Sequence, residues 1–526
     1  MKKLNKIVEI LLILLPSILF FSYHPNISLG STDSMHLDLS LPLISLALVS
    51  LFSLPLLPKI IKNTPKKALV ALAIIPCYTI FSLIWSSNPL RTFLSAGVLI
   101  CLAITILVLP YIAKNTPKFV SKTSTIFLAT ATAVSIFAWL QSILDFLGVS
   151  REVTLLCEGC TYQSFGFPHP NSFAIEPQFF GNLLLAPSFL CLYYILYHKK
   201  GKKSILPCPL LWAIAIFLII TLFFTFSRGA IYAFLASIAC LTIYQLFKKH
   251  YKYLILIPVI LCCAIFSLIC QGVFAEISPT TDTFTSAITK SIHHLSLGKI
   301  DLRVNLKEEK CDTMHGQGQA ADVSSRDLFC DRPLGRGTKY GQNTIGGDPV
   351  TTGVATGARE GTSEPEPVGV EDADEKISSF DGYVEDSTNI RLELNEMALD
   401  TWNDSPRNIF LGAGLGGAGP VLYQKFPDLG TEKQIVQNEY FSLLLEFGLV
   451  GIAIIIAAAI LIVTSIKIKD KSQKAWLLTL LFAYAITLLF FSGLPNALHI
   501  YLLPFYATLF SKHQFLINGK IKKHNH

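Results

Sequence analysis

The feature that most constrains this chain is a succession of apolar segments, each about 18 to 25 residues long, which is the length that crosses a bilayer core of about 30 Å as a helix. Hydrophobic residues make up 52% of the sequence and charged residues only 15%, well below the roughly 25% of soluble domains. The sequence therefore predicts an all-α polytopic membrane protein with about twelve transmembrane helices. The expected spans are approximately residues 7–23, 37–57, 68–86, 92–113, 123–148, 177–197, 206–226, 228–247, 252–271, 436–466, 475–493 and 495–511.

Basic residues alternate between the loops that join these segments. Lysines cluster in one set of loops, whereas the short loops of the other set contain only Arg91, Arg151 and Arg228. Because cytoplasmic loops carry the excess of Lys and Arg, this asymmetry places both termini in the cytoplasm and residues 272–435 on the outer side. It also accounts for the net charge of +7, so nucleic acid is not an expected partner.

The predicted organisation has three parts. Residues 1–271 hold about nine helices, residues 272–435 form a long extracytoplasmic loop, and residues 436–526 return to the membrane and end in a cytoplasmic tail. Ile277, Phe284 and Ile288 are spaced like one face of a short amphipathic helix. Residues 301–385 are rich in Gly, Thr, Asp and Glu, and we expect a disordered insertion there, with order resuming near Thr388.

Two local features have alternative interpretations. The first apolar segment follows three lysines like a signal peptide, but no small-residue cleavage pattern follows it cleanly, and a retained helix is favoured. Two cysteine pairs, Cys157 with Cys160 and Cys311 with Cys330, are expected outside, where disulfides form. No second pair has zinc spacing, so a structural bridge or free thiols are favoured over a metal site.

The stretch 387–466 is the strongest candidate for chemistry. It contains Arg391, the glycine run 412–419 and the polar segment 437–440, and it then enters an apolar helix at Phe441. A polar loop that ends on a membrane helix is suited to reactions of a membrane-bound substrate.

Four motifs in this order resemble those of one family. They are Thr225-Phe-Ser-Arg-Gly-Ala230, Arg391 at the start of an amphipathic helix, Asp404-Ser-Pro-Arg-Asn-Ile-Phe-Leu-Gly-Ala-Gly-Leu-Gly416, and Asn438-Glu-Tyr-Phe-Ser-Leu-Leu-Leu-Glu-Phe-Gly-Leu-Val-Gly451. Over about 170–270 and 387–466, the sequence resembles the O-antigen ligase and O-antigen polymerase family of bacterial membrane glycosyltransferases.

The resemblance implies an all-helical, C-type glycosyltransferase that uses no metal and no other cofactor. Its substrates would be an undecaprenyl-diphosphate-linked glycan and a glycan or lipid acceptor at the outer face of the membrane. We expect catalytic roles for Arg228, Arg391, Gln437 and Glu439. We expect substrate contacts from Glu176, Ser227, Arg407, Gly414, Gly416, Asn438 and Tyr440.

Elementary chemistry favours the two arginines. Guanidinium is always charged and grips phosphate oxygens in a bidentate way, and fixed cations stabilise the charge that develops on a departing diphosphate. The alternatives are a snorkelling anchor for Arg228 and a solvated helix charge for Arg391. An anchor on the outer side would oppose the positive-inside bias, which favours a functional Arg228.

The sequence departs from the family pattern at Gln437. Related ligases carry His at this position, as a base or to orient the acceptor, whereas the Gln amide does not take a proton at neutral pH. Either the base lies elsewhere, with Glu439, His293 and His294 as candidates, or the reaction needs only hydrogen-bond orientation.

Glu176, Glu446 and the glycine run each have a structural interpretation as well as a functional one. Glu176 either orients an acceptor hydroxyl or pairs with Arg228, or it is a charge at a helix N-terminus that the helix dipole favours. Glu446 is expected to bond a neighbouring element, and the glycine run to form a turn rather than to approach a sugar.

A transporter or flippase of a lipid-linked or polysaccharide substrate is the alternative function. It is disfavoured because the predicted mid-helix stretches contain almost no ionisable residues and the two halves show no repeat. A structural or sensory membrane protein would have no clear use for the two outer arginines.

Overall fold

The computed structural model describes residues 2–32, 35–156, 168–197, 205–277, 283–297, 379–429, 432, 435–465, 471–491 and 497–510. Most of the expected insertion at 301–385 and the four cysteines at 157, 160, 311 and 330 lie outside the described residues. The last part of that stretch is helical, however, because a helix begins at Ser379. This helix begins nine residues before Thr388, near which order is predicted to resume.

Each of the twelve predicted spans contains a helix. These are α1 (Lys2–Ile18), α2 (Leu41–Ser53) continued by α3 (Leu57–Asn63), α4 (Lys66–Ser82), α5 (Pro89–Asn115), α6 (Phe119–Phe146), α8 (Pro177–Tyr197), α9 (Cys208–Phe224), α10 (Arg228–Phe247), α11 (Leu256–Ile277), α16 (Glu439–Ser465), α17 (Lys471–Thr487) and α18 (Leu498–Phe510).

Among the described residues, seven helical segments are long and apolar enough to cross a membrane, and α9 and parts of α17 and α18 are shorter apolar helices. An all-α polytopic membrane architecture is thus supported, whereas the number of twelve spans and the three-part division stay predictions.

One predicted helix starts differently. Residues Asn26–Thr32 (β1) and Met35–Ser40 (β2) form an antiparallel hairpin, so the helix expected from residue 37 begins at Leu41. The segment Met35-His-Leu-Asp-Leu-Ser40 alternates apolar and polar residues, which is the period of a strand and not of a helix.

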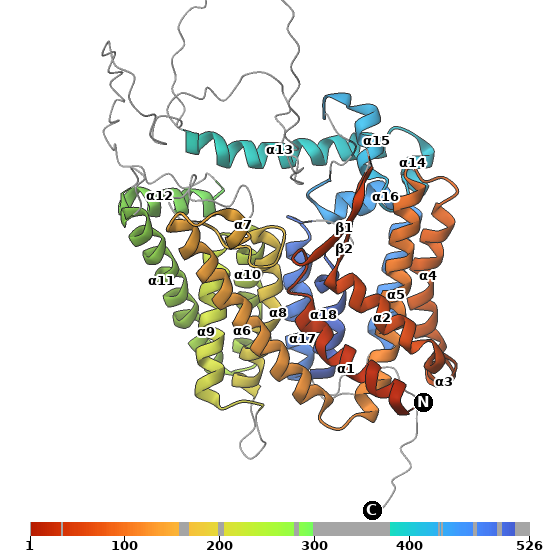
Figure 1. The fold of residues 1–526 in the computed structure, drawn as a ribbon, viewed down its shortest axis with the longest axis horizontal. Helices are drawn as coiled ribbons and strands as arrows, with labels where there is room; N and C mark the ends of the chain where they lie inside the picture. The colour runs from red at the N-terminus through yellow and green to blue at the C-terminus, as the bar shows by residue number, and fades with distance from the viewer. Residues whose placement is uncertain are drawn as a thin grey trace, which may run out of the picture.

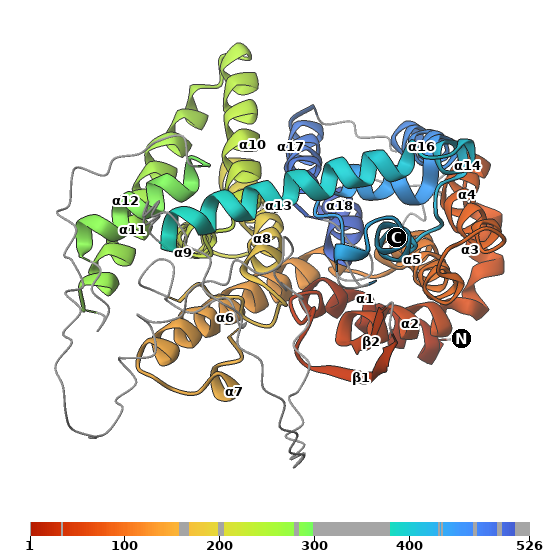
Figure 2. The same ribbon diagram turned by 90° about the horizontal axis from the view of Figure 1, so that it is seen from above.

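The bundle helices stand side by side, and one helix lies across their end. Figure 1 shows α13 (Ser379–Trp402) over the top of the bundle, together with α12 (Phe284–Leu295), α7 (Arg151–Thr154), α14 (Pro406–Leu411) and α15 (Ala418–Lys425). Seen from above, α13 runs from the side of α9 and α12 to the side of α14 and α16 (Figure 2). We call this end of the bundle the α13 end.

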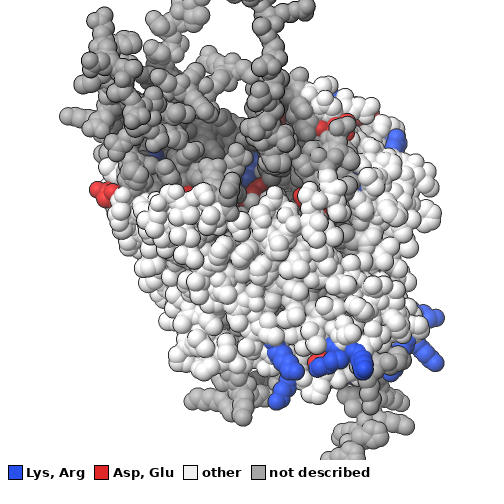
Figure 3. Space-filling model, in the orientation of Figure 1, with Lys and Arg blue, Asp and Glu red and all other residues white. Residues whose placement is uncertain are grey.

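Charged side chains are unevenly distributed on the face shown in Figure 3. Lys and Arg side chains gather at the lower edge, opposite the α13 end, and the band between them and the upper edge is almost free of charge on that face. The N-terminus lies at the same lower edge (Figure 1). This is the distribution that the lysine clusters predict for a protein whose apolar band is surrounded by lipid.

Two of the apolar clusters among the described residues stabilise the bundle and attach α13 to it. The larger one joins the helices of the bundle, with fully buried side chains such as Leu12, Phe127, Phe180, Phe234 and Tyr506. The smaller one attaches α13 through Leu394, Met397 and Ala398, which pack with Leu422, Val436 and Leu445. Leu394, Met397 and Ala398 recur at helical spacing, so one face of α13 packs on the bundle.

Candidate functional site

The turn between α9 and α10 is built by short-range contacts of its own sequence. Phe226 adopts a left-handed conformation with φ of 51°, and Ser227 caps α10 by accepting a hydrogen bond from the Ala230 amide at 3.4 Å. Arg228 follows as the first helical residue and is only 8% exposed. Gly229 is required because a Cβ atom there would lie 2.8 Å from the Cβ of Phe490. Ser227, expected to bind substrate, thus has a capping role.

Arg228 and Arg391 act on the same imidazole. His294, in the last turn of α12, is buried, and this burial is the largest cause that holds its pKa well below the usual value. The Arg228 guanidinium, and to a smaller extent that of Arg391, lowers the pKa of His294 further. Two cations near an imidazole disfavour its protonated form. The first turn of α10, the last turn of α12 and the middle of α13 therefore bring Arg228, His294 and Arg391 within electrostatic range of one another.

Glu176 belongs to the same polar cluster. It precedes the first residue of α8, and burial raises the pKa of its carboxyl group while the charge of Arg391 opposes that shift. The partner that the structure gives to Glu176 is therefore Arg391, whereas the sequence suggested Arg228. We call Glu176, Arg228, His294 and Arg391 the arginine cluster.

A row of three rings forms the wall behind this cluster. The His169 ring stacks on Phe226 with centroids 5.0 Å apart and an interplanar angle of 5°, and the Phe226 ring lies 6.3 Å from that of His294. His294 also makes a hydrogen bond to the backbone of Phe226. Burial lowers the pKa of His169 to about 3, so this imidazole is neutral at neutral pH.

The predicted polar entrance to α16 is a capped helix start. Asn438 accepts hydrogen bonds from the amides of Tyr440 and Phe441 at 3.0 and 3.4 Å. The Tyr440 hydroxyl donates to the Ala485 carbonyl at 2.8 Å. Asn438 and Tyr440 thus have structural contacts at the two positions expected to bind substrate. Gln437, half-buried, directly precedes the cap.

The end of α17 connects this entrance to the arginine cluster. The Glu439 amide donates to the Leu488 carbonyl at 2.9 Å. Two residues further on, the Phe490 carbonyl accepts a hydrogen bond from Gln178 of α8, and Phe490 packs against Gly229 of α10. The motif around Arg228 and the motif around Asn438 therefore lie on either side of one short segment, although some 200 residues separate them in the sequence.

The glycine run is tightly packed between two other parts of the protein. Gly412, Gly414 and Gly416 have φ of 73°, 85° and 82°, and a Cβ atom on each would lie within 2.7 Å of another residue. On one side, the Ala413 and Gly414 amides donate to the carbonyls of α16 residues at 2.9 Å. On the other side, the loop between α4 and α5 donates to the run through Ser87. Gly414 and Gly416 thus allow close packing of the backbone with protein.

Glu446 and Arg407 hold the same region. Glu446 accepts a hydrogen bond from the Ala418 amide at 3.4 Å and lies within electrostatic range of Arg91, whose side chain covers Gly416. Arg407 is exposed and donates to the carbonyl of Trp85. Arg407, Gly414 and Gly416 therefore contact the α4–α5 loop and the start of α5. Glu446 of α16 lies on the other side of the glycine run and bonds to it.

Two residues that contact these groups, Arg91 and His169, were not among the predicted site residues. Arg91 served only to assign topology, although it is an outer-side cation like Arg228 and the same argument applies to it. His169 lies in the segment Pro168-His-Pro-Asn171, and no periodicity signals its stacking on Phe226. Among the described residues, no group of three His, Cys, Asp or Glu side chains is arranged to hold a metal ion.

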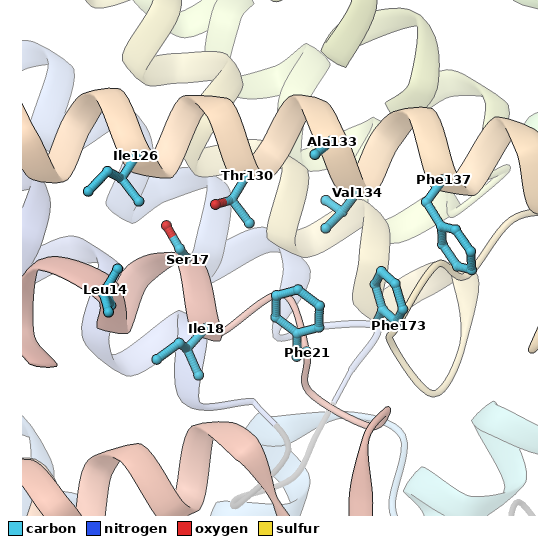
Figure 4. A pocket seen from close by; sticks show the side chains of 10 residues that line it. All are labelled: Leu14, Ser17, Ile18, Phe21, Ile126, Thr130, Ala133, Val134, Phe137 and Phe173. Carbon is cyan, nitrogen blue, oxygen red and sulfur yellow. The ribbon is translucent and has the colours of Figure 1, made fainter.

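A separate apolar groove of about 490 Å³ lies between α1 and α6. Figure 4 shows Leu14, Ile18 and Phe21 facing Ile126, Val134 and Phe137 across it, with Phe173 at one end. Among the described residues that line it, Ser17 and Thr130 are the polar ones. Phe173 lies on the loop that also carries His169 and Glu176. The end of the groove is therefore close in sequence to Glu176 of the arginine cluster.

Comparison with protein families matches residues 213–456 to the O-antigen ligase model. The match begins in α9 and ends in α16, and it includes Arg228, His294, Arg391 and Glu439. No curated protein and no solved structure matches the chain. The match over residues 213–456, which hold all four motifs noted in the sequence, supports membership of the O-antigen ligase family.

Proposed function

We propose that this protein transfers glycan from an undecaprenyl-diphosphate carrier to a glycan or other surface acceptor, without a metal. The family match supports an O-antigen ligase-like membrane glycosyltransferase. The observation that carries the proposal further is the arginine cluster, in which Arg228 and Arg391 both act on His294 and a half-buried Glu176 lies within electrostatic range of Arg391.

The cluster has the chemistry of a diphosphate site. Arg228 is the first residue of α10 and Glu176 immediately precedes α8, so two helix N-termini, with their positive dipole ends, lie beside the guanidinium groups. When the bond between the sugar and the diphosphate breaks, negative charge grows on the phosphate oxygen, and cations already in place stabilise it. We assign Arg228 and Arg391 to this role.

The acceptor would enter from the side of α16. Glu439 and Gln437 lie at the start of that helix, joined to the arginine cluster by the end of α17. A carboxylate and an amide at that place orient a hydroxyl group through hydrogen bonds. We therefore assign acceptor orientation to Glu439 and Gln437.

The hydrocarbon chain of the carrier needs an apolar surface that opens to lipid. The groove between α1 and α6 provides one, and its end at Phe173 is three residues from Glu176 in the sequence. We assign the proximal part of the polyprenyl chain to this groove. With the diphosphate at the α13 end, that end faces away from the cytoplasm, in line with the lysine distribution.

The flippase alternative is less well supported by this arrangement. A transporter of a charged substrate binds it near the middle of the membrane, whereas the arginine cluster is assembled from the starts of α8 and α10 and from helices that lie across the end of the bundle.

The proposal is tested by loss of the protein in its native host and by reconstitution. Mass analysis of surface glycans and lipid-linked intermediates after gene deletion should show accumulated carrier-linked glycan, as single repeat units for a polymerase or as long chains for a ligase. Purified protein in vesicles should then transfer that glycan to the acceptor. Unchanged lipid-linked intermediates in the deletion strain would contradict the proposed function.

A further inference from the structure

The reaction proposed above releases a proton from the acceptor hydroxyl, and the amide of Gln437 does not take it at neutral pH. Three groups named from the sequence remain: Glu439, His293 and His294. The Glu439 carboxylate accepts a hydrogen bond from the Tyr501 hydroxyl at 2.7 Å and is set beside the end of α17. His294 differs from both other groups because its ring is held against the turn that carries Arg228.

The position of His294 is fixed by contacts from several elements. It is 8% exposed, it makes a hydrogen bond to the backbone of Phe226, and its ring lies 6.3 Å from the Phe226 ring, whose centroid is in turn 5.0 Å from that of His169. The next residue, Leu295, accepts a hydrogen bond from the Tyr232 hydroxyl of α10. An imidazole held in this way has one defined place beside the diphosphate site.

From these contacts we propose that His294 is the general base of glycan transfer and that binding of the lipid diphosphate switches it on. This inference rests on the proposed function. Without a bound diphosphate, the guanidinium groups of Arg228 and Arg391 keep the His294 imidazole neutral. A bound diphosphate offsets their charge, so the imidazole becomes a stronger base only when the donor substrate is present.

The groups that face His294 make this switch electrostatically consistent. Arg228 and Tyr232 come from α10, His169 from the loop before α8, and Arg391 from α13, where Glu176 lies opposite. On α11, Glu276 accepts a hydrogen bond from the Phe284 amide at 2.7 Å, at the other end of α12. Burial and both arginines hold the pKa of His294 well below its usual value, which is the direction that a bound anion reverses.

The chemical step balances without another reactant. The acceptor oxygen forms a bond to the anomeric carbon, and the bond between that carbon and the diphosphate oxygen breaks, leaving its electron pair on the diphosphate. His294 takes the hydroxyl proton and then returns it to the departing lipid diphosphate. Arg228 and Arg391 neutralise the leaving group throughout.

The first test measures binding and not turnover. Full-length protein in nanodiscs of uncharged phospholipid is titrated with undecaprenyl diphosphate between pH 5.5 and 8. If the ligand raises the pKa of His294, binding takes up a proton, and affinity increases as pH falls by up to about tenfold per pH unit between the free and bound pKa values. His294→Gln should lose this component, and His293→Gln, its neighbour in the same helix turn, should keep it. An identical pH dependence in wild type and His294→Gln would overturn the proposal.

The wild-type protein alone gives a second readout if His294→Gln does not fold. Calorimetric titration in buffers of different ionisation enthalpy measures the protons exchanged on binding. The ligand is the carrier-linked glycan without acceptor, because both phosphates of this diester are already ionised between pH 5.5 and 8 and release no proton on binding. Uptake of a proton on binding, as pH is lowered through this range, supports the switch, and no uptake at any pH in this range rejects it.

Turnover then separates this inference from the function on which it rests. In single-turnover transfer of the carrier-linked glycan, His294→Gln should be slower by about 10²- to 10⁴-fold with undecaprenyl diphosphate affinity near pH 8 unchanged. Normal transfer by His294→Gln would refute the base assignment and leave the transferase function intact. Failure of the wild type to bind undecaprenyl diphosphate would instead reject both.

Discussion

Tyr501 donates a hydrogen bond to the Oε1 atom of Glu439, with 2.7 Å between the two oxygen atoms. The contact joins α18 to the first residue of α16. Glu439 is only 4% exposed, and a buried carboxylate is tolerated where hydrogen bonds replace its lost water. Together with the bond from the Glu439 amide to Leu488, it fixes the entrance of α16 beside the end of α17.

Tyr501→Phe removes this hydrogen bond while keeping the ring. Because hydrogen bonds to charged groups contribute about 1.5–3 kcal/mol, we expect the free energy of unfolding to fall by about that amount. Thermal unfolding of the purified protein measures the change. Tyr251→Phe, at a side chain that is 65% exposed, is the matched control and should leave the midpoint unchanged. Equal midpoints for both variants would contradict a stabilising contact.

Substitutions in the arginine cluster are expected to weaken binding of the donor substrate. Arg228→Ala and Arg391→Ala each remove a charged donor to the diphosphate, and at about 1.5–3 kcal/mol per charge-assisted bond the affinity for undecaprenyl diphosphate should fall about 10- to 150-fold. Lysine at either position should restore only part of it, because an ammonium group lacks the bidentate geometry. Binding to the protein in nanodiscs is the measurement.

Lys425→Gln is the control for charge alone. Lys425 also lies at the α13 end, but it pairs with Asp400 and Asp404 at 2.9 and 3.2 Å. We expect its replacement to change the affinity less than about twofold, because exposed ion pairs contribute little. A loss as large as that of Arg228→Ala would mean that the general field of this end, and not a defined site, attracts the diphosphate.

Much of this arrangement was predictable because the signals were periodic and long. Apolar length identified the helices, and the helical spacing of Leu394, Met397 and Ala398 agrees with the packed face of α13. The hairpin at 26–40 was missed because its alternation is short and directly precedes a membrane helix. Such local boundaries depend on a few residues, whose pattern competes with the strong signal of the adjacent span.

The site was less predictable, since it depends on contacts between distant segments. The alternation of basic residues between loops predicted that Arg228 and Arg391 lie on the same side of the membrane, but nothing in the sequence brings both within electrostatic range of His294 or stacks His169 on Phe226. The glycine run is another example. Its composition is compatible with an open turn or a ligand loop, and only the position of Ser87 and Glu446 on either side reveals a packed joint.

That joint should be intolerant of side chains. Gly412→Ala would place a Cβ atom 2.5 Å from the backbone of Glu446 at a φ of 73°, so both the contact and the backbone conformation are unfavourable. We expect a loss of at least about 1–3 kcal/mol in the free energy of unfolding. Gly97→Ala in α5 has nothing within 4 Å of the added Cβ and should raise stability by about 0.5–1 kcal/mol. Opposite shifts of the two thermal midpoints are the expected result, and a stable Gly412→Ala would disprove the packed joint.

His169 predicts how stability depends on pH. Its pKa is about 3 in the folded protein against an ordinary value of 6.5, so the unfolded chain binds a proton that the folded chain does not. The stabilisation is complete above pH 6.5 and decreases as pH falls toward 3, by up to about 1.4 kcal/mol per pH unit. His169→Gln should flatten this dependence, measured as the unfolding midpoint between pH 7 and 4. A slope equal to that of the wild type would show that His169 titrates in the folded protein.

The groove between α1 and α6 can be filled without disturbing the core. Ala133 lines the groove and is exposed, whereas Ile136, on the same helix, is 57% exposed outside it. Ala133→Trp places an indole ring where we assign the polyprenyl chain. Because each buried CH₂ group contributes about 0.8 kcal/mol, displacing two of them should weaken donor binding by at least about tenfold. Ile136→Trp adds the same ring to the lipid-facing surface and should leave donor affinity unchanged.

A second ligand distinguishes binding of the polyprenyl chain from binding of the diphosphate in this experiment. A soluble diphosphate with a short prenyl chain does not reach the groove, so its affinity should be the same in wild type and Ala133→Trp. Equal weakening of the long-chain and short-chain ligands would show that the indole ring distorts the arginine cluster through Phe173. Equal affinity of both variants for undecaprenyl diphosphate would place the chain elsewhere on the bundle, since a groove of about 490 Å³ that holds it cannot also hold the ring.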